Sequence, residues 1–285
     1  MNMSCSVPDS AALDARLSGI VDQIRNRTAL IPEAAMILGS GLDGVVDMIE
    51  SPTEISYREL NGMPVSTVSG HEGKYIFGTL SGVRVVCMKG RVHYYEGYEM
   101  SEVVIPTRVM ALLGAKVIII TSSAGGIRKD LHCGDFMAVT DHISGNVPSP
   151  LRGYCPASPD NRFPDMSCAY DPALRRILHE TGSEIGINVS EGVFIQTAGP
   201  QFETPAEIRK YARDGADAVS MSLACEAAAA RQMGMRVCGV VCISNPAAGV
   251  SDEPITWDVI YSTGKQSSAR LAELIRRSLP KMLAL

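Results

Sequence analysis

Hydrophobic residues recur at helical spacing near the beginning of the chain, at residues 9–24. The apolar positions there are Leu13, Leu17, Ile20, Val21 and Ile24. Positions three and four apart lie on one face of an α-helix, and the Asp-Ser pair in front of them suits a helix start. This segment is therefore predicted to form an amphipathic helix with one buried face.

Beyond it, short apolar runs alternate with stretches of helical spacing. Strands are predicted at residues 34–38, 116–121, 192–196, 217–221 and 235–244, with a hairpin over residues 74–88. Helices are predicted at residues 101–114, 204–214, 225–234 and 256–280, and from residue 171 onward. The alternation continues without a linker or a repeat, and the hairpin adds an antiparallel pair. We therefore predict a single α/β domain over residues 1–285, with a central mixed β-sheet flanked by helices.

Composition and charge restrict the partners of this domain. Of the 285 residues, 46% are hydrophobic, which is enough for a substantial core. The formal net charge is -5 and the basic residues are scattered, so nothing attracts a nucleic-acid backbone. No apolar run approaches the ~18 residues needed to cross a bilayer, and the N-terminus lacks an export signal pattern. We expect a soluble, cytoplasmic protein that binds neither nucleic acid nor membranes.

The eight cysteines contain no C-x-x-C pair, and several lie inside apolar runs. Buried thiols in a reducing compartment fit this distribution better than disulfides or a metal site. We therefore expect free cysteines and no bound metal.

A glycine-rich segment follows the first predicted strand. Residues 39–44 read Gly-Ser-Gly-Leu-Asp-Gly, which fits the G-x-G-x-x-G fingerprint, and a helix start is expected after them. Glycines let the backbone approach an anion, and Ser40 adds a hydroxyl. A dinucleotide site also needs an acidic residue that ends a second strand, but Glu59 ends no strand and Pro52 stops the helix. From these residues alone, a structural turn, a free phosphate site and a dinucleotide site stay open.

The segment GRVHYYEG, after the predicted hairpin, concentrates polar side chains. Arg91 has a planar, forked guanidinium that suits phosphate, histidine such as His93 generally titrates near neutral pH, and Tyr95 adds a hydroxyl. Glu96 is placed to orient the imidazole. An exposed loop is the alternative interpretation. His71, between glycines in "SGHEG", is a weaker candidate, since a lone histidine in a loop usually has no function.

Three further candidates lie beside predicted strand ends, where ligands bind in open α/β sheets. Glu203 precedes a capping box, so we expect its carboxylate to be free for a ligand. Ser222 either caps a helix or presents its hydroxyl to an anion. Asn245 offers a donor and an acceptor in one plane, or else begins a turn before Pro246.

Together these segments resemble a known family. The order GSGL, GHEG, GRVHYYEG, SSAGGIR, GDFMAVTDHI, GPQFETPAEIR, GADAVSMSLACEAAAAR and ISN closely resembles the trimeric class of purine nucleoside phosphorylases, from Met36 to Asn245. The resemblance implies a nucleoside phosphorylase-like fold. It also implies a homotrimeric enzyme that cleaves a purine nucleoside with inorganic phosphate, giving free base and pentose 1-phosphate, without metal or organic cofactor.

The resemblance also assigns site residues. Phosphate is assigned to Ser40, His71, Arg91, His93, Ser123 and Ser222. The purine is assigned to Phe202, Glu203 and Asn245, and the pentose to Tyr95, Met221 and Trp257. The catalytic residues implied are Asn245, His93, Glu96 and Glu203. With phosphate as the bound anion, the dinucleotide interpretation is withdrawn and Gly44 is expected to be incidental.

Asn245 bears on the choice of purine. The resemblance implies that it donates to N7 as negative charge builds on the departing base, while Glu203 accepts from N1. Relatives that use 6-amino substrates tend to carry Asp at this position. The sequence therefore predicts 6-oxopurine substrates, inosine or guanosine.

Some positions depart from the family pattern. Ser122 and Ser123 stand where many relatives have Asn-Ala, and Pro246 follows Asn245. Trp257 falls where relatives offer a His to the pentose 5′-hydroxyl, and either shapes that subsite or packs on its own helix. The alternatives are therefore another specificity, for xanthosine, adenosine or 5′-methylthioadenosine, or a non-catalytic purine-binding oligomer. For the aromatic residue that a neighbouring subunit often supplies, Phe163 is the candidate.

Overall fold

The computed structural model describes residues 10–67, 73–144, 146–154 and 159–285. Within these ranges the strands form one nine-stranded sheet, in the order β2-β3-β4-β1-β5-β8-β7-β6-β9, and β5 also pairs with β9. The strands are β1 (Ala34–Ile37), β2 (Glu50–Ser56), β3 (Lys74–Leu80), β4 (Val83–Lys89), β5 (Val117–Gly126), β6 (Phe136–Ile143), β7 (Val189–Gln196), β8 (Ala218–Ser220) and β9 (Arg236–Pro246). The extra pairing closes β5, β8, β7, β6 and β9 into a ring.

The predicted mixed sheet is confirmed. Strand β1 runs parallel to both of its neighbours, β4 and β5, and β5 runs parallel to β9. The predicted hairpin is the antiparallel pair β3–β4, and β8 and β6 also make antiparallel contacts. Because β4, β1, β5 and β9 are parallel, their carboxyl ends lie at the same edge of the sheet.

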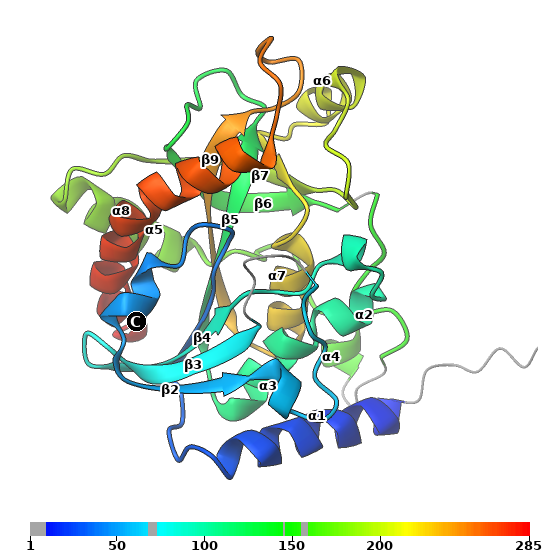
Figure 1. The fold of residues 1–285 in the computed structure, drawn as a ribbon, viewed down its shortest axis with the longest axis vertical. Helices are drawn as coiled ribbons and strands as arrows, with labels where there is room; N and C mark the ends of the chain where they lie inside the picture. Colours follow the sequence, from blue (N-terminus) through cyan, green and yellow to red (C-terminus); the bar gives the residue numbers. More distant parts are fainter. Residues whose placement is uncertain (1–9, 68–72, 145, 155–158) are drawn as a thin grey trace, which may run out of the picture.

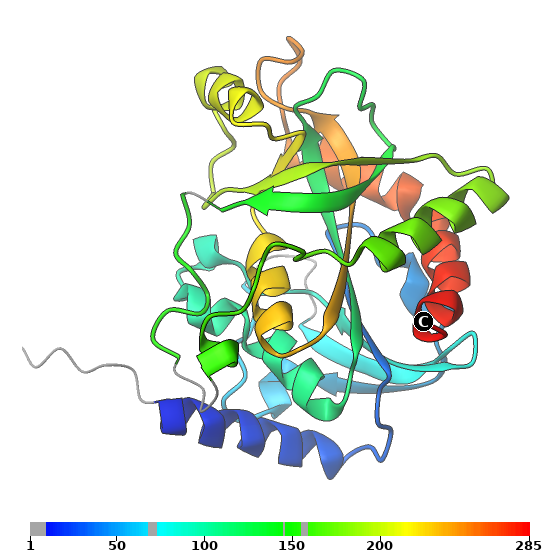
Figure 2. The ribbon, with the colours of Figure 1, turned by 180° about the vertical axis from the view of Figure 1, so that it is seen from behind.

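Helices cover both sides of the sheet. They are α1 (Ser10–Arg25), α2 (Met100–Val103), α3 (Ile105–Leu113), α4 (Pro159–Arg162), α5 (Pro172–Glu184), α6 (Pro205–Arg213), α7 (Ala224–Gln232) and α8 (Trp257–Leu283), with 3-10 turns η1 (Gly44–Met48), η2 (Tyr57–Glu59) and η3 (Tyr94–Glu96). Helices α5 and α8 lie on one side of β5 and β9, and α3 and α7 lie on the other (Figures 1 and 2).

Alternation along the central strands divides the core between these two sides. Ile118 and Ile120 of β5 pack with the cluster of α1, α3 and α7, whereas Val117 and Ile119 pack with that of α5 and α8. Successive residues of a strand point to opposite faces, so a strand covered on both faces is apolar throughout. Each such side chain stabilises the fold by about 1.5–3 kcal/mol.

The N-terminal helix is confirmed, because α1 buries Leu17, Ile20, Val21 and Ile24. Strands β2 and β6 were not predicted. The first is an exposed edge strand of mostly polar residues that contains Pro52, and a proline is tolerated at a sheet edge because its missing N–H breaks no interior ladder. The second has four buried residues followed by a polar half, so its apolar run is short.

The glycine-rich segment differs from the prediction. The helix expected after it is only the five-residue turn η1, and the strand β2 begins before Pro52. Gly44 has a packing role: its N–H donates to Ser268 Oγ at 2.8 Å, and a Cβ there would lie 2.7 Å from the same oxygen. A Cβ on Gly39 would lie 2.8 Å from Ser122 Cα. These two glycines are therefore required by close packing against α8 and β5.

No helix in the described ranges is long and apolar enough to span a membrane.

Candidate active site

One cavity lies where the carboxyl ends of the parallel strands meet. Its volume is about 700 Å³, including the part open to solvent. It is lined by Gly39, Ser40, Arg91, His93, Tyr95, Ser122, Ser123, Ala124, Gly125, Phe202, Glu203, Val219, Ser220, Met221, Ser222, Ser244, Asn245, Ala247, Ile255, Trp257 and Ile260. The structure thus brings together all the described candidate residues except Phe163 and Glu96, and Glu96 lies behind His93.

The candidate His71 lies outside the described residues. Phe163 follows α4 with 76% of its surface exposed, so it is open to contact from another molecule.

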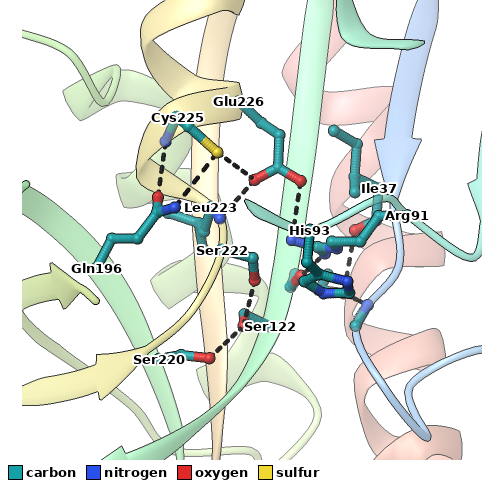
Figure 3. A network of polar contacts seen from close by, with 12 residues as sticks. Ile37, Arg91, His93, Ser122, Gln196, Ser220, Ser222, Leu223, Cys225 and Glu226 are labelled. Atoms are coloured by element: carbon teal, nitrogen blue, oxygen red, sulfur yellow. Dashed lines mark hydrogen bonds and ion pairs between the residues drawn. The ribbon is translucent and has the colours of Figure 1, made fainter. Parts of the chain in front are cut away.

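Arg91 lies just after β4 and is almost completely buried, with an exposed fraction of 1%. Its Nη2 donates to the carbonyl oxygen of Thr121 in β5, and its Nη1 lies 3.1 Å from Oε1 of Glu226 in α7 (Figure 3). The guanidinium is therefore held in place from two elements while it lines the cavity.

Serine hydroxyls from three segments meet in the wall of the cavity. Ser122 Oγ in β5 lies 3.2 Å from Ser220 Oγ in β8 and 3.2 Å from Ser222 Oγ (Figure 3). Ser123 Oγ donates to the carbonyl oxygen of Ser40 at 2.9 Å. These hydroxyls form a polar surface suited to an anion, since each rotates to donate or accept.

The turn before α7 has an uncommon backbone. Leu223 has φ 80° and ψ −52°, and the N–H of Ala224 donates to the carbonyl oxygen of Ser222 at 3.1 Å, which is a γ-turn. Leu223, not Ser222, is the N-cap of α7, so the capping alternative for Ser222 is wrong. The Leu223 N–H donates to Oε2 of Glu226, three residues further on (Figure 3). The turn directs Ser222 toward Ser122.

His93 is fixed by Glu96. Its ring Nδ1 lies 3.1 Å from Oε1 of Glu96, and its backbone N–H donates to the same oxygen at 2.7 Å. The imidazole ring also stacks on the ring of Tyr95, with 4.7 Å between the centroids. Burial lowers the pKa of His93, against the opposing effect of Glu96. Burial alone would raise the pKa of Glu96, but hydrogen bonds from His93 and Thr67 outweigh it and lower that pKa to about 2. The ionised carboxylate therefore accepts from Nδ1–H and leaves Nε2 for other contacts.

Two groups suited to a planar heterocycle line the same cavity. We expected the Glu203 carboxylate to be free, but its Oε1 accepts a hydrogen bond from Thr197 Oγ1 at 2.7 Å. Asn245 is 6% exposed; its Oδ1 accepts from Ser244 Oγ and its Nδ2 donates to the Pro246 carbonyl, both at 2.8 Å. The turn interpretation for Asn245 is wrong, because β9 extends through Pro246.

The start of α8 adds an apolar wall. Trp257 is the first residue of the helix and stacks on Tyr261 with 6.4 Å between centroids, and Ile255 and Ile260 lie beside it on the cavity. The Trp257 ring therefore packs on its own helix and also lines the cavity.

Several residues of the site were missed by the sequence interpretation. Glu226, Thr121, Ser220 and Thr197 all bond to residues of the cavity wall. Only Glu226 carried a signal, because it is the one acidic residue in the alanine-rich run of α7. In the described part of the chain, no cluster of three or more His, Cys, Asp or Glu side chains is arranged to hold a metal ion.

Known proteins are similar to this chain in sequence and fold. Residues 33–280 match the family model described as Phosphorylase superfamily. Purine nucleoside phosphorylase 1 of Geobacillus stearothermophilus is 44% identical over 253 residues, which cover 88% of this chain and 92% of that protein. The purine nucleoside phosphorylase of Bos taurus is 38% identical over 86% of this chain and 87% of its own length.

Solved structures agree. A Schistosoma purine nucleoside phosphorylase in complex with hypoxanthine has a TM-score of 0.87 and 34% identity, covering 94% of this chain and 97% of that chain. The Schistosoma mansoni enzyme in complex with inosine has a TM-score of 0.86 at 34% identity, covering 94% and 96%. The chain therefore belongs to the purine nucleoside phosphorylases of the phosphorylase superfamily.

Proposed function

We propose that this protein catalyses the phosphorolysis of purine nucleosides and prefers inosine and guanosine. The observation that carries the proposal is the composition of the cavity. A buried guanidinium, an imidazole and a group of hydroxyls share one space with a carboxylate and a planar amide. The first set suits inorganic phosphate, and the second suits a purine.

Phosphate is bound by Arg91, His93 and the hydroxyls of Ser40 and Ser222, with the backbone at Ser123. Arg91 supplies a charge that does not titrate near neutral pH. Phosphate in this place lies against the sugar, where its negative charge stabilises the positive charge that develops on the anomeric carbon.

The reaction is a displacement at that carbon. The bond from C1′ to the purine nitrogen breaks and its electron pair stays with the base, while a phosphate oxygen bonds to C1′. Asn245 donates to N7 as the base becomes negative, and Glu203 accepts from the N1–H of a 6-oxopurine. No metal or organic cofactor takes part, and phosphate is a co-substrate.

Release of hypoxanthine from inosine, measured with and without phosphate, tests this proposal. We expect release that depends on phosphate. The Asn245→Ala variant should lose about 10²–10³ in kcat/KM, because it removes one donor aimed at developing charge. If calorimetry showed that inosine and guanosine bind but the protein released no base from them, the protein would instead be a purine-binding oligomer without turnover.

A second specificity is favoured by the apolar wall. Trp257, which the resemblance assigns to the 5′ end of the pentose, lines the cavity together with Ile255 and Ile260. An apolar subsite favours a 5′-methylthio group over a 5′-hydroxyl. Comparing kcat/KM for inosine, guanosine, xanthosine, adenosine and 5′-methylthioadenosine decides between the two. A larger value for 5′-methylthioadenosine than for inosine would overturn the preference proposed above.

The active form is a cytoplasmic homotrimer in which Phe163 reaches the cavity of a neighbouring subunit. Its high exposure supports this assignment, since a large aromatic side chain open to solvent suits an interface.

A further inference from the structure

We propose that Glu226 is a positioning residue for phosphate, because one carboxylate holds both Arg91 and the turn that carries Ser222. The inference rests on the proposed function, which makes these two groups phosphate ligands. Glu226 itself does not line the cavity, so it acts through its two neighbours.

Glu226 is a buried acidic side chain whose two oxygens have different partners. It is 1% exposed, whereas acidic residues are almost never fully buried without a partner. One oxygen lies 3.1 Å from Arg91 Nη1, and the other accepts from the Leu223 N–H and lies 3.6 Å from Cys225 Sγ. The two oxygens therefore face different elements, as Figure 3 shows.

The first contact fixes the guanidinium. With the Glu226 carboxylate in an ion pair with Nη1 and the Thr121 carbonyl accepting from Nη2, the Arg91 fork is held from α7 and from β5. A fork that binds phosphate through two parallel hydrogen bonds depends on its orientation as well as its charge. A loosened fork would keep its charge and lose part of this geometry.

The second contact fixes the turn. Leu223 has a positive φ of 80°, which a non-glycine residue adopts only when its surroundings hold it there. The hydrogen bond from its N–H to Glu226 is one such restraint, and Leu223 itself is completely buried. Ser222 immediately precedes this residue, so the same carboxylate sets the position of its hydroxyl.

Stability alone does not require this pair. A buried ion pair contributes little net stability, since desolvation of the two charges offsets their attraction. An apolar pair of similar volume serves a core equally well. A role in orienting Arg91 gives the pair a function that an apolar pair would not supply.

The test is Glu226→Gln, which keeps the shape and an oxygen for Leu223 but puts a neutral amide beside Arg91. We expect the KM for phosphate to rise about tenfold, with the KM for inosine changed less than twofold. The matched control is Cys225→Ala, which removes a thiol beside the same carboxylate without touching Arg91, and should leave both KM values unchanged. Glu226→Asp, which restores the charge on a shorter side chain, should recover part of the loss.

A double-mutant cycle separates positioning from a general structural effect. If Glu226 acts through Arg91, Glu226→Gln should have little further effect on phosphate KM in an Arg91→Ala background. Equal changes in both KM values, or effects that add fully in the double variant, would overturn the inference.

Calorimetric measurement of inorganic phosphate binding, without nucleoside, tests the role of Glu226 independently of the proposed function. A wild-type protein without turnover would refute the proposed function, yet weaker phosphate binding by Glu226→Gln than by Cys225→Ala would still support the role of Glu226. Equal binding by the two variants would refute it. If Glu226→Gln does not fold, the same comparison is made with Glu226→Asp.

Discussion

Two carboxylates behind the cavity hold its basic side chains by different means. Glu96 keeps His93 in one tautomer through hydrogen bonds, and Glu226 holds Arg91 through charge. Neither carboxylate lines the cavity, and each contacts a basic side chain that does. Such supporting groups affect activity because a donor that is misplaced loses most of its effect.

Glu96 also makes stability depend on pH. Its side chain is 1% exposed and its pKa in the folded protein is about 2, below the usual value of 4.5. A depressed carboxyl pKa contributes stability above about pH 4.5 that is lost as the pH falls toward 2. Glu96→Gln should therefore lower the free energy of unfolding by roughly 2–3 kcal/mol at pH 6, and this difference should shrink as the pH is lowered to 4 and below.

Urea unfolding at several pH values measures this effect. The exposed Glu99 offers a control, because Glu99→Gln changes the net charge by the same amount. A difference between wild type and Glu96→Gln that stayed constant from pH 6 to pH 3.5 would show that the hydrogen bonds of Glu96 do not depress its pKa.

At the scale of elements, the loop after β1 is shaped by helix α8. Gly41 has φ 74°, and a Cβ there would lie 2.9 Å from the Tyr261 carbonyl oxygen and 3.0 Å from the Lys265 nitrogen. Lys265 also binds Asp43 at 2.6 Å, which ties the same loop to the same helix. The position of Ser40 therefore depends on how closely α8 approaches.

Gly41→Ala tests this approach. The change adds both left-handed strain and a collision with backbone atoms, and should destabilise the protein by about 2–4 kcal/mol. Gly82→Ala is the matched control, since Gly82 has φ 82° and nothing within 4 Å of an added Cβ, and should cost only about 1 kcal/mol. Similar melting temperatures for the two variants would mean that α8 does not constrain the loop.

At the scale of the whole molecule, the sheet collects the site from distant parts of the chain. The parallel strands β4, β1, β5 and β9 bring their carboxyl ends to one edge, and β8 adds the segment of Met221 and Ser222. The proposed trimer adds a residue from outside the chain. Phe163 does not reach the cavity of its own chain, so its proposed role depends on assembly.

Sedimentation equilibrium tests the assembly. We expect a mass three times that of the 30.5 kDa chain. Phe163→Ala should leave this mass unchanged and raise the KM for inosine several-fold, because the pocket loses one aromatic wall. Phe202→Ala, which removes an aromatic residue from the chain's own cavity wall, should also raise the KM for inosine and gives the scale for this effect. A monomer with full activity would contradict the proposal.

The sequence alone determined the fold class and most of the candidate residues. Apolar runs such as residues 117–120 indicated buried strands, because the period of hydrophobic residues follows directly from strand and helix geometry. The order of motifs indicated the family, and Arg91 and Asn245 both lie near strand ends on the cavity. Residue type and spacing are local properties, so they can be interpreted without coordinates.

Only the tertiary structure decided how these residues are held. Gly44 meets Ser268 across 224 residues of chain, and Glu226 meets Arg91 between separate elements. The polar edge strand β2 and the closure of β5 on β9 were equally invisible to local pattern. Such contacts depend on packing between segments far apart in the sequence, and the pattern within any one segment does not specify which distant partner it will meet.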